Sequence, residues 1–144
     1  MRKKILIVED NSELLELMRL ALKQAGFRTA TASNGADALT VAQEAAPDGV
    51  VLDLVLPELD GFAVCESLRR NPATAGIPII VLTGLSSEFA RLASLEAGAD
   101  EYVTKPVSLE TLVSTIKQLL RRPEKLRATR PASSATVAQG AGPS

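Results

Sequence analysis

The stretch Lys3-Lys4-Ile5-Leu6-Ile7-Val8-Glu9-Asp10 is the part of the chain that decides the expected fold. Its four consecutive apolar residues, three of them β-branched, are typical of a strand that is buried on both faces. Two acidic residues follow directly, so this strand is expected to end in a pair of carboxylates. Asn11 can then cap a helix that ends at Gly26.

The alternation of a short apolar run with an amphipathic helix recurs along the chain. Further strands are expected at residues 27–32, 50–52, 78–82 and 99–103, and further helices at residues 35–44, 61–70, 87–96 and 108–122. Five strands that alternate with five helices predict an α/β fold, in which helices cover both faces of a parallel sheet. In the first helix, the spacing predicts one buried face made of Leu14, Leu17, Met18, Ala21, Leu22 and Ala25.

The composition is that of an ordinary globular domain, with 46% hydrophobic and 23% charged residues over 144 positions. Sixteen basic and seventeen acidic residues give a net charge of −1, which argues against electrostatic capture of nucleic acid. The chain has no histidine, which excludes histidine-dependent catalysis and imidazole metal ligands. Its single cysteine, Cys65, cannot form an intrachain disulfide and is expected to be buried helix filler.

The two ends of the chain suggest its location and its domain boundary. The first apolar run is shorter than the about 7–15 residues of a secretory signal or the about 20 residues of a membrane helix. A cytoplasmic protein without membrane contact is therefore expected. Residues 131–144 carry no charge and almost no large apolar side chain. They predict a disordered tail or linker at residues 123–144, after a folded domain at residues 1–122.

Acidic, hydroxyl and basic side chains follow the expected strands. Glu9 and Asp10 end the first strand, Asp53 the third and Thr83 the fourth, and Lys105 follows the fifth. Because the crevice of an open parallel sheet lies at the carboxyl ends of its strands, we expect these groups to converge. Three carboxylates in one crevice raise one another's pKa unless a cation joins them, and Mg²⁺ suits such ligands. The alternative is that these acids are unrelated and only cap helices or lie in loops.

Four segments resemble the response-regulator receiver domain of two-component signalling. They are Ile7-Val8-Glu9-Asp10-Asn11, Val51-Leu52-Asp53-Leu54-Val55-Leu56-Pro57-Glu58-Leu59-Asp60-Gly61, Leu82-Thr83-Gly84 and Gly98-Ala99-Asp100-Glu101-Tyr102-Val103-Thr104-Lys105-Pro106. The resemblance extends over residues 3–122 in order and spacing. It implies a flavodoxin-like receiver fold, whose five parallel strands have the order 2-1-3-4-5.

The resemblance also implies a role for each matched residue at the strand ends. Asp53 resembles the phospho-acceptor, and Thr83 resembles the hydroxyl that engages the phosphoryl group. Lys105 resembles the lysine that assists phosphorylation. Glu9 and Asp10 resemble the acidic pair that binds Mg²⁺ together with the acceptor, although that pair is often two aspartates.

Further positions match the family around this site. Val55 matches the residue whose backbone carbonyl binds the metal ion, and Tyr102 matches the aromatic switch residue. Lys105-Pro106 matches a dipeptide with a cis peptide bond. Val55 and Leu85 stand two residues after the acceptor and the hydroxyl residue, where the family's side chains flank the path of the attacking water.

These matches imply a signalling switch rather than an enzyme, with catalysis limited to its own phosphorylation and dephosphorylation. Because the chain has no histidine, a partner histidine kinase, a phosphotransfer protein or a small acyl phosphate must supply the phosphoryl group. Phosphorylation of Asp53 is expected to remodel the surface formed by helix 87–96, strand 99–103 and helix 108–122. A downstream effector or a second copy would dock there.

A homodimer through that surface is suggested by a second likeness. Asp100 and Glu101 resemble the acidic pair of a dimerising subfamily of transcriptional receivers, and Lys117 and Arg122 offer opposite charges. Thr115, however, stands where that subfamily usually has an arginine.

Two other functions remain open from the sequence. A haloacid-dehalogenase-type phosphohydrolase also uses a strand-end aspartate, but it needs an acid two residues later, where this chain has Val55. A pseudo-receiver that only binds a partner would not need the full set of polar residues. Among the remaining charges, Arg69 and Arg70 are expected to interact with the carboxyl end of their helix.

Overall fold

Residues 2–122 are described by the structure, a computed structural model. The five strands are β1 (Lys4–Val8), β2 (Arg28–Ala32), β3 (Gly49–Leu52), β4 (Ile79–Thr83) and β5 (Glu101–Thr104). They form one parallel sheet in the order β2-β1-β3-β4-β5, which confirms the expected topology. The tail predicted at residues 123–144 lies outside the described residues.

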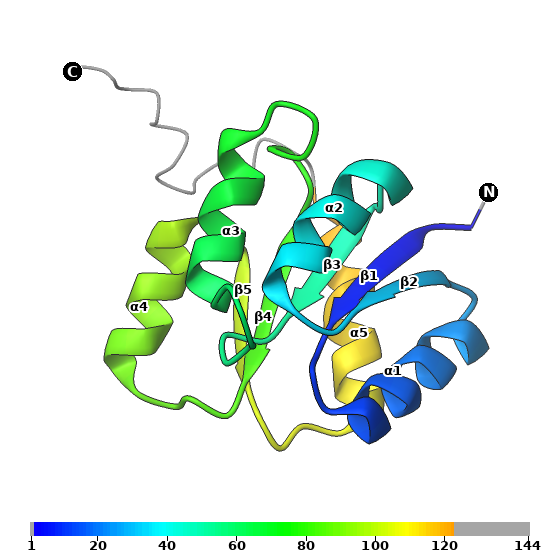
Figure 1. Cartoon of the computed structure of the whole chain (residues 1–144). Coiled ribbons are helices and arrows are strands. Elements are labelled where there is room, and N and C mark those ends of the chain that lie inside the picture. The colour runs from blue at the N-terminus through cyan, green and yellow to red at the C-terminus, as the bar shows by residue number, and fades with distance from the viewer. Residues whose placement is uncertain (1, 123–144) are drawn as a thin grey trace.

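Five helices connect the strands and cover the sheet. They are α1 (Ser12–Gln24), α2 (Gly35–Ala45), α3 (Gly61–Arg70), α4 (Glu88–Ala97) and α5 (Leu109–Arg121). Helices α1 and α5 lie on one face of the sheet, and α2, α3 and α4 lie on the other (Figure 1). In residues 2–122, none of the helices combines the length and the apolar character that crossing a bilayer requires.

Each central strand contributes to two cores, which explains its unbroken apolar sequence. On β1, Leu6 and Val8 pack with residues of α2 and α3, whereas Ile5 and Ile7 pack with residues of α1 and α5. Successive side chains of a strand point to opposite faces, so a strand covered on both sides needs apolar residues at every position. Strand β2 lies at the edge of the sheet and is correspondingly more polar.

Side-chain caps begin all five helices, and the one predicted at Asn11 is among them. In each helix the cap side chain accepts a hydrogen bond from the backbone N–H three residues later, and the five caps are Asn11, Asn34, Asp60, Ser87 and Ser108. Each cap satisfies one of the N–H groups that a helix start leaves without a partner. The caps thereby fix the loops at the carboxyl edge of the sheet.

The buried face of α1 is narrower than predicted. Met18 and Leu22 are buried against the sheet, but Leu17 is 53% exposed and Leu20 is also exposed. Consecutive residues of a helix lie about 100° apart around its axis. Leu17 therefore points away from the face that Met18 presents to the sheet, and its predicted place in the buried face is wrong.

Arg69 is a second difference from the sequence analysis. Beyond the predicted place at the carboxyl end of α3, it forms a buried ion pair in which its Nη2 lies 2.9 Å from Asp100 Oδ2. The same guanidinium donates to the carbonyls of Gly98 at 3.0 Å, Ala75 at 3.0 Å and Ile77 at 2.6 Å. The pair therefore joins the end of α3 to the loop that precedes β4 and to the loop that follows α4.

Arg70, the next residue, does behave as a surface charge. Its Nη2 lies 3.5 Å from Glu66 Oε1 in an exposed contact within α3. Cys65 is buried in the same helix, as expected.

Candidate functional site

Two neighbouring strands place the acidic side chains at the carboxyl edge of the sheet. Val8 and Leu52 are register partners in β1 and β3, so Glu9 and Asp53 follow side by side. The backbone N–H of Asp53 donates to the Val8 carbonyl at 3.1 Å, which keeps both strand ends in register. Glu9, Asp10 and Asp53 each offer a carboxylate oxygen, and these atoms lie within 4.8 Å of one another.

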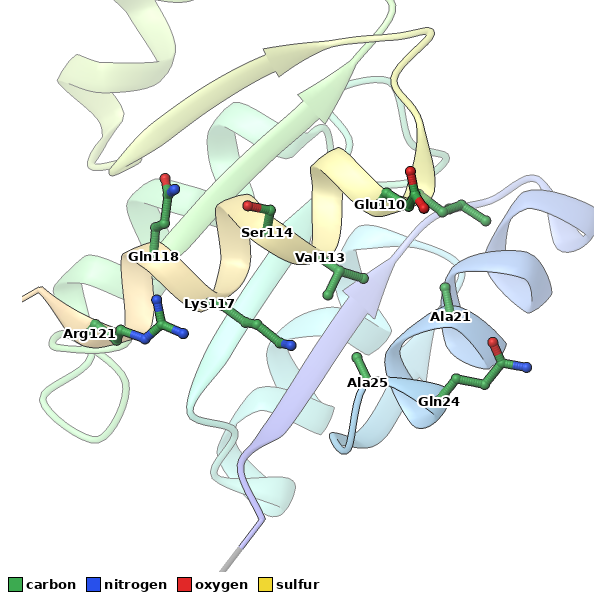
Figure 2. Close-up of a pocket in the computed structure, with 10 residues that line it drawn as sticks. Ala21, Gln24, Ala25, Glu110, Val113, Ser114, Lys117, Gln118 and Arg121 are labelled. Carbon is green, nitrogen blue, oxygen red and sulfur yellow. The ribbon is translucent and has the colours of Figure 1, made fainter.

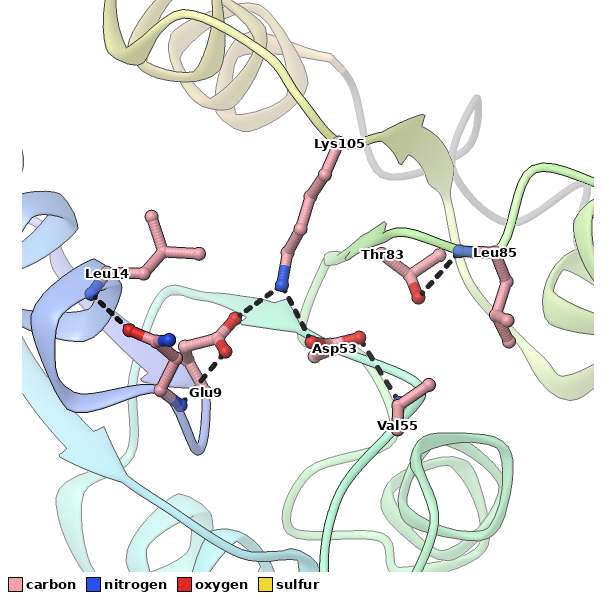
Figure 3. A network of polar contacts seen from close by, with 8 residues as sticks. Glu9, Leu14, Asp53, Val55, Thr83, Leu85 and Lys105 are labelled. Atoms are coloured by element: carbon pink, nitrogen blue, oxygen red, sulfur yellow. Dashed lines mark hydrogen bonds and ion pairs between the residues drawn. The ribbon is translucent and has the colours of Figure 1, made fainter.

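Lys105 bridges two of these carboxylates (Figure 3). Its Nζ lies 2.9 Å from Glu9 Oε1 and 2.8 Å from Asp53 Oδ2. Burial lowers the pKa of the Lys105 ammonium, but the hydrogen bonds to Asp53 and Glu9 and their negative charges outweigh it. The pKa of Lys105 is therefore raised above its ordinary value, and the ammonium stays charged at neutral pH.

The two bridged carboxylates are also held by backbone groups. Glu9 Oε2 accepts a hydrogen bond from the Asn11 N–H at 3.1 Å, and Asp53 Oδ1 accepts one from the Val55 N–H at 3.2 Å. Glu9 is 2% exposed and Asp53 is 5% exposed, whereas Asp10 is exposed. The orientations of the two buried acids are thus fixed by both Lys105 and the loop backbone.

The loop that carries Asp53 packs closely against α3. A Cβ atom on Gly61 would lie 2.3 Å from the Asp53 carbonyl oxygen, a distance at which the backbone would have to move. Only glycine fits this approach, so the start of α3 restrains the loop after β3. Leu54 anchors the same loop in the core.

The acidic cluster has the chemistry of a divalent-cation site. Three carboxylates face one ammonium, and the excess negative charge is concentrated in a small volume. Hard cations such as Mg²⁺ take oxygen ligands from carboxylates, carbonyls and water. The donors present therefore fit Mg²⁺. The expected contribution of the Val55 carbonyl stays a prediction.

A second group of contacts links Thr83 to Tyr102. Thr83 is fully buried, and its Oγ1 accepts a hydrogen bond from the Leu85 N–H at 3.3 Å. The Tyr102 hydroxyl donates to the Leu85 carbonyl. Burial raises the pKa of Tyr102 above its ordinary value, so this hydroxyl remains a donor at neutral pH. The segment from Thr83 to Leu85 thereby connects the site to β5.

Val55 and Leu85 form an apolar rim at the site. Both side chains are exposed although they are large and apolar. Figure 3 shows them on the loops that follow β3 and β4, next to Asp53 and Thr83. The peptide bond between Lys105 and Pro106 is cis, which is the isomer implied by the resemblance.

The structure corrects the proposed ion pairs of a dimer. Asp100 is not available on the surface, because its side chain is 2% exposed and paired with Arg69. Glu101 forms an ion pair with Arg122 of the same chain. The prediction that Asp100 pairs with a charge of a second copy is therefore wrong, and Glu101 already has a partner.

The contacts between the site residues were not predictable from the sequence. Strand order brought Glu9, Asp53 and Lys105 to one edge, but nothing in the sequence showed that Lys105 contacts both acids. The hydrogen bond of Tyr102 to the Leu85 carbonyl was missed as well. The match of Tyr102 to the switch position was the only signal that pointed toward it.

The strand order and the strand-end side chains define a receiver-type α/β domain. Residues 5–117 match the family described as the response regulator receiver domain, and the chain belongs to that family.

Several known proteins are similar to this chain. The alkaline phosphatase synthesis transcriptional regulatory protein PhoP of Bacillus subtilis is 42% identical over 124 residues, which cover 86% of this chain and 51% of that protein. A CheY-like receiver domain protein of Methanospirillum hungatei has a TM-score of 0.81 at 29% identity, over 88% of this chain and 99% of that one. The chain spans about half the length of the curated relatives it matches.

One solved structure was determined with a metal ion. The receiver domain of the sensor histidine kinase PA1611 of Pseudomonas aeruginosa has a magnesium ion coordinated in its active-site cleft. It has a TM-score of 0.78 and 27% identity, over 85% of this chain and 100% of that one.

Proposed function

We propose that this domain is a phosphorylation-activated switch whose acceptor is Asp53. The observation that carries the proposal is the position of the Asp53 carboxylate, which lies at the edge of the sheet beside Glu9 and Asp10 and in contact with Lys105. A carboxylate oxygen there can attack phosphorus, so that a new O–P bond forms while the bond from phosphorus to the donor's leaving group breaks. The donor is a partner histidine kinase, a phosphotransfer protein or a small acyl phosphate.

The residues around Asp53 supply positioning and positive charge. Asp10, Asp53, Glu9 and the Val55 carbonyl are the groups that would hold Mg²⁺. When bound, Mg²⁺ neutralises charge that develops on the phosphoryl oxygens. Lys105 lies within contact of Asp53 and can turn its ammonium toward the same oxygens. The magnesium ion in the PA1611 receiver supports this arrangement.

The contacts of Thr83 suggest how phosphorylation of Asp53 would change the structure beyond the site. When the Thr83 hydroxyl turns to donate to the phosphoryl group, its contact with the Leu85 N–H lengthens unless the Leu85 backbone follows. Since the Leu85 carbonyl holds the Tyr102 hydroxyl, such a shift would also release or move Tyr102. The phosphoryl group would then stabilise the conformation in which Thr83 contacts it, which is a shift of population between two states.

The shift of Tyr102 suggests where a partner docks, and the names of the relatives suggest which process the domain controls. The surface of α4, β5 and α5 contains Tyr102, and we place there the docking of a downstream effector or a second copy. Several relatives are transcriptional regulators, so control of transcription by a longer protein is the output we propose. The domain would act in the cytoplasm and would catalyse only its own phosphorylation and dephosphorylation.

Incubation with labelled acetyl phosphate and Mg²⁺ tests this function. A stable label that is lost in Asp53→Asn would support the switch. Release of phosphate without label on the protein would instead indicate a phosphohydrolase. Neither label nor turnover would indicate a binding module.

A further inference from the structure

The acceptor loop, residues 53–60 between β3 and α3, lies against the start of α2. A Cβ atom on Gly35 would lie 2.0 Å from the Leu59 carbonyl oxygen and 2.7 Å from the Leu59 Cβ, so a side chain at this position would displace the backbone. The Gly35 N–H also donates to the Pro57 carbonyl at 3.4 Å. The loop and the first residue of α2 are therefore packed backbone against backbone, which only glycine allows.

The loop turns sharply at Glu58 in a conformation that costs free energy. Glu58 has a φ of 72°, in the left-handed region, and the Leu59 N–H donates to the Pro57 carbonyl at 2.8 Å. A hydrogen bond over two residues around a positive φ is typical of the rare and strained form of γ-turn. The Glu58 side chain is exposed, so its own packing does not hold the turn. Such a conformation persists only when neighbouring contacts impose it, and Gly35 supplies one of them.

The strained turn is close along the chain to the groups of the acidic site. Leu54 is buried in the core, and the N–H at the start of α3 donates to its carbonyl at 2.9 Å. Only Val55 and Leu56 separate this fixed point from Pro57, where the turn begins. The Val55 N–H donates to Asp53 Oδ1 at 3.2 Å, and the Val55 carbonyl is a proposed Mg²⁺ ligand. A displacement of the turn would therefore shift the Val55 backbone and, with it, the support of Asp53.

We propose that Gly35 is a positioning residue for the metal site, because it lets α2 hold the turn at Glu58 and thereby fixes the Val55 backbone for Mg²⁺ binding. The inference rests on the proposed function and extends the site to α2, which contributes none of the proposed ligands. Contacts that orient a ligand raise metal affinity, since less of the loop has to become ordered when the ion binds. Gly35 acts through these contacts and touches neither the ion nor the phosphoryl group.

The supports of the acceptor loop lie on the α2 and α3 side of the sheet. Leu56 and Leu59 pack against the core on that side. On the other side, a groove of about 580 Å³ between α1 and α5 is lined by residues such as Ala21 and Val113 (Figure 2). Neither Gly35 nor any residue of the acceptor loop lines this groove. The packing of α1 against α5 is therefore separate from the support of the loop.

Calorimetric titration of Mg²⁺ into Gly35→Ala tests the proposal. We expect an affinity about ten-fold below that of the parent, which is in the range for residues that support a metal ligand. Alanine favours a helix more than glycine does, so a loss would come from the contact with Leu59. The matched control is Gly49→Ala at the amino end of β3, where the added Cβ would lie 3.2 Å from the flexible Ile5 side chain. An unchanged Mg²⁺ affinity in folded Gly35→Ala, or an equal loss in Gly49→Ala, would overturn the proposal.

A pair of substitutions at Glu58 tests the turn even if Gly35→Ala does not fold. Glu58→Gly and Glu58→Val remove the same exposed carboxylate, so their electrostatic effects on Mg²⁺ binding are equal. Glycine accepts a φ of 72°, whereas a β-branched residue strongly disfavours it. The Mg²⁺ affinity of Glu58→Val should therefore be at least about five-fold below that of Glu58→Gly, because strain now opposes the turn. Equal affinities in the two folded variants would contradict the role of the turn and overturn the proposal.

Nuclear magnetic resonance spectra without metal provide a second readout. The amide signal of Val55 should shift in Gly35→Ala and in Glu58→Val but not in Gly49→Ala, and an unmoved signal in the first two would overturn the proposal. None of these measurements uses a phosphoryl donor, so they distinguish this inference from the proposed function. A parent that binds no Mg²⁺ would overturn both, whereas a parent that binds Mg²⁺ but takes no label from acetyl phosphate would overturn only Asp53 as the acceptor.

Discussion

The two ends of the sheet both carry buried charged groups, but they differ in charge balance. At the carboxyl end, Glu9, Asp10 and Asp53 share one ammonium, that of Lys105. At the amino end, Arg69 and Asp100 form a one-to-one pair. The remaining donors of that guanidinium reach three backbone carbonyls, and the Asp100 carboxylate also accepts from the Ile79 N–H at 2.9 Å.

This difference separates a structural ion pair from a functional cluster. A buried pair with matched charge and full hydrogen bonding needs no ligand, and its contribution is to hold segments together. A cluster with excess acid favours a bound cation, because its like charges otherwise repel one another. The Arg69 pair therefore marks a structural joint, whereas the Asp53 cluster marks a place for positive charge and a phosphoryl group.

Replacement of the acceptor is expected to have the largest effect. Asp53→Asn should abolish incorporation of label from acetyl phosphate, because an amide cannot form an acyl phosphate. Its free energy of unfolding without metal should not fall below that of the parent, since one of three like charges is removed. Labelling at the parent rate would show that the acceptor lies elsewhere. A large loss of stability would instead show that Asp53 has mainly a structural role.

Breaking the pair at the amino end should destabilise the fold. Arg69→Met leaves the buried Asp100 carboxylate unpaired, which costs about 3–5 kcal/mol of unfolding free energy. Arg70→Met, on the next residue of the same helix, should change it by less than about 1 kcal/mol because its ion pair is exposed. Urea denaturation measures both. Similar losses in the two variants would contradict the special role of Arg69, and phosphorylation per folded molecule should persist in each.

The exposed acid of the cluster should affect metal binding more than stability. Asp10→Ala is expected to lower Mg²⁺ affinity at least about ten-fold. Loss of a residue that only supports a metal ligand already costs about ten-fold or more in affinity, and Asp10 is proposed as a ligand itself. Calorimetric titration measures this affinity, and Asp37→Ala, an exposed acid on α2, is the control. Unchanged affinity in Asp10→Ala would show that the acidic cluster is not the metal site.

The apolar rim should set the lifetime of the phosphoryl group. Val55 and Leu85 cannot orient a water molecule and tend to exclude it, so dephosphorylation should be slow. The double variant Val55→Asn, Leu85→Glu should lose its label about ten-fold faster, which corresponds to about 1.4 kcal/mol of barrier. The decay of the purified labelled protein is the measurement. If the variant decays at the parent rate, the rim does not control access of water.

Local signals made most of the fold predictable. The apolar runs at β1, β3 and β4 needed no distant information, because strands buried on both faces have a distinctive composition. The helix caps were equally local, since Asn11 or Ser108 acts on an N–H three residues away. Leu17 was assigned wrongly because a helix that lies on a sheet buries a narrower stripe than the spacing of its leucines suggested.

The candidate site was predictable in its members but not in its contacts. Parallel strand ends meet at one edge, so Glu9 and Asp53 could be placed together without a structure. The bridge from Lys105 to Glu9 joins residues 96 apart, and the contact of Arg69 with Asp100 joins residues 31 apart. No periodicity encodes such contacts, which depend on side-chain reach within the assembled fold.

The packing of α5 against α1 has a consequence for synthesis of the protein. Met18 and Leu22, near the start of the chain, share a core with Ile116 and Leu119, near the end of the described residues. A growing chain therefore cannot complete this core until α5 has left the ribosome, whereas the core on the other face needs nothing beyond β5. Until then, the apolar side of the first helix stays open to water and to chaperones. Helix α5 is thus the element that completes the folded domain during synthesis.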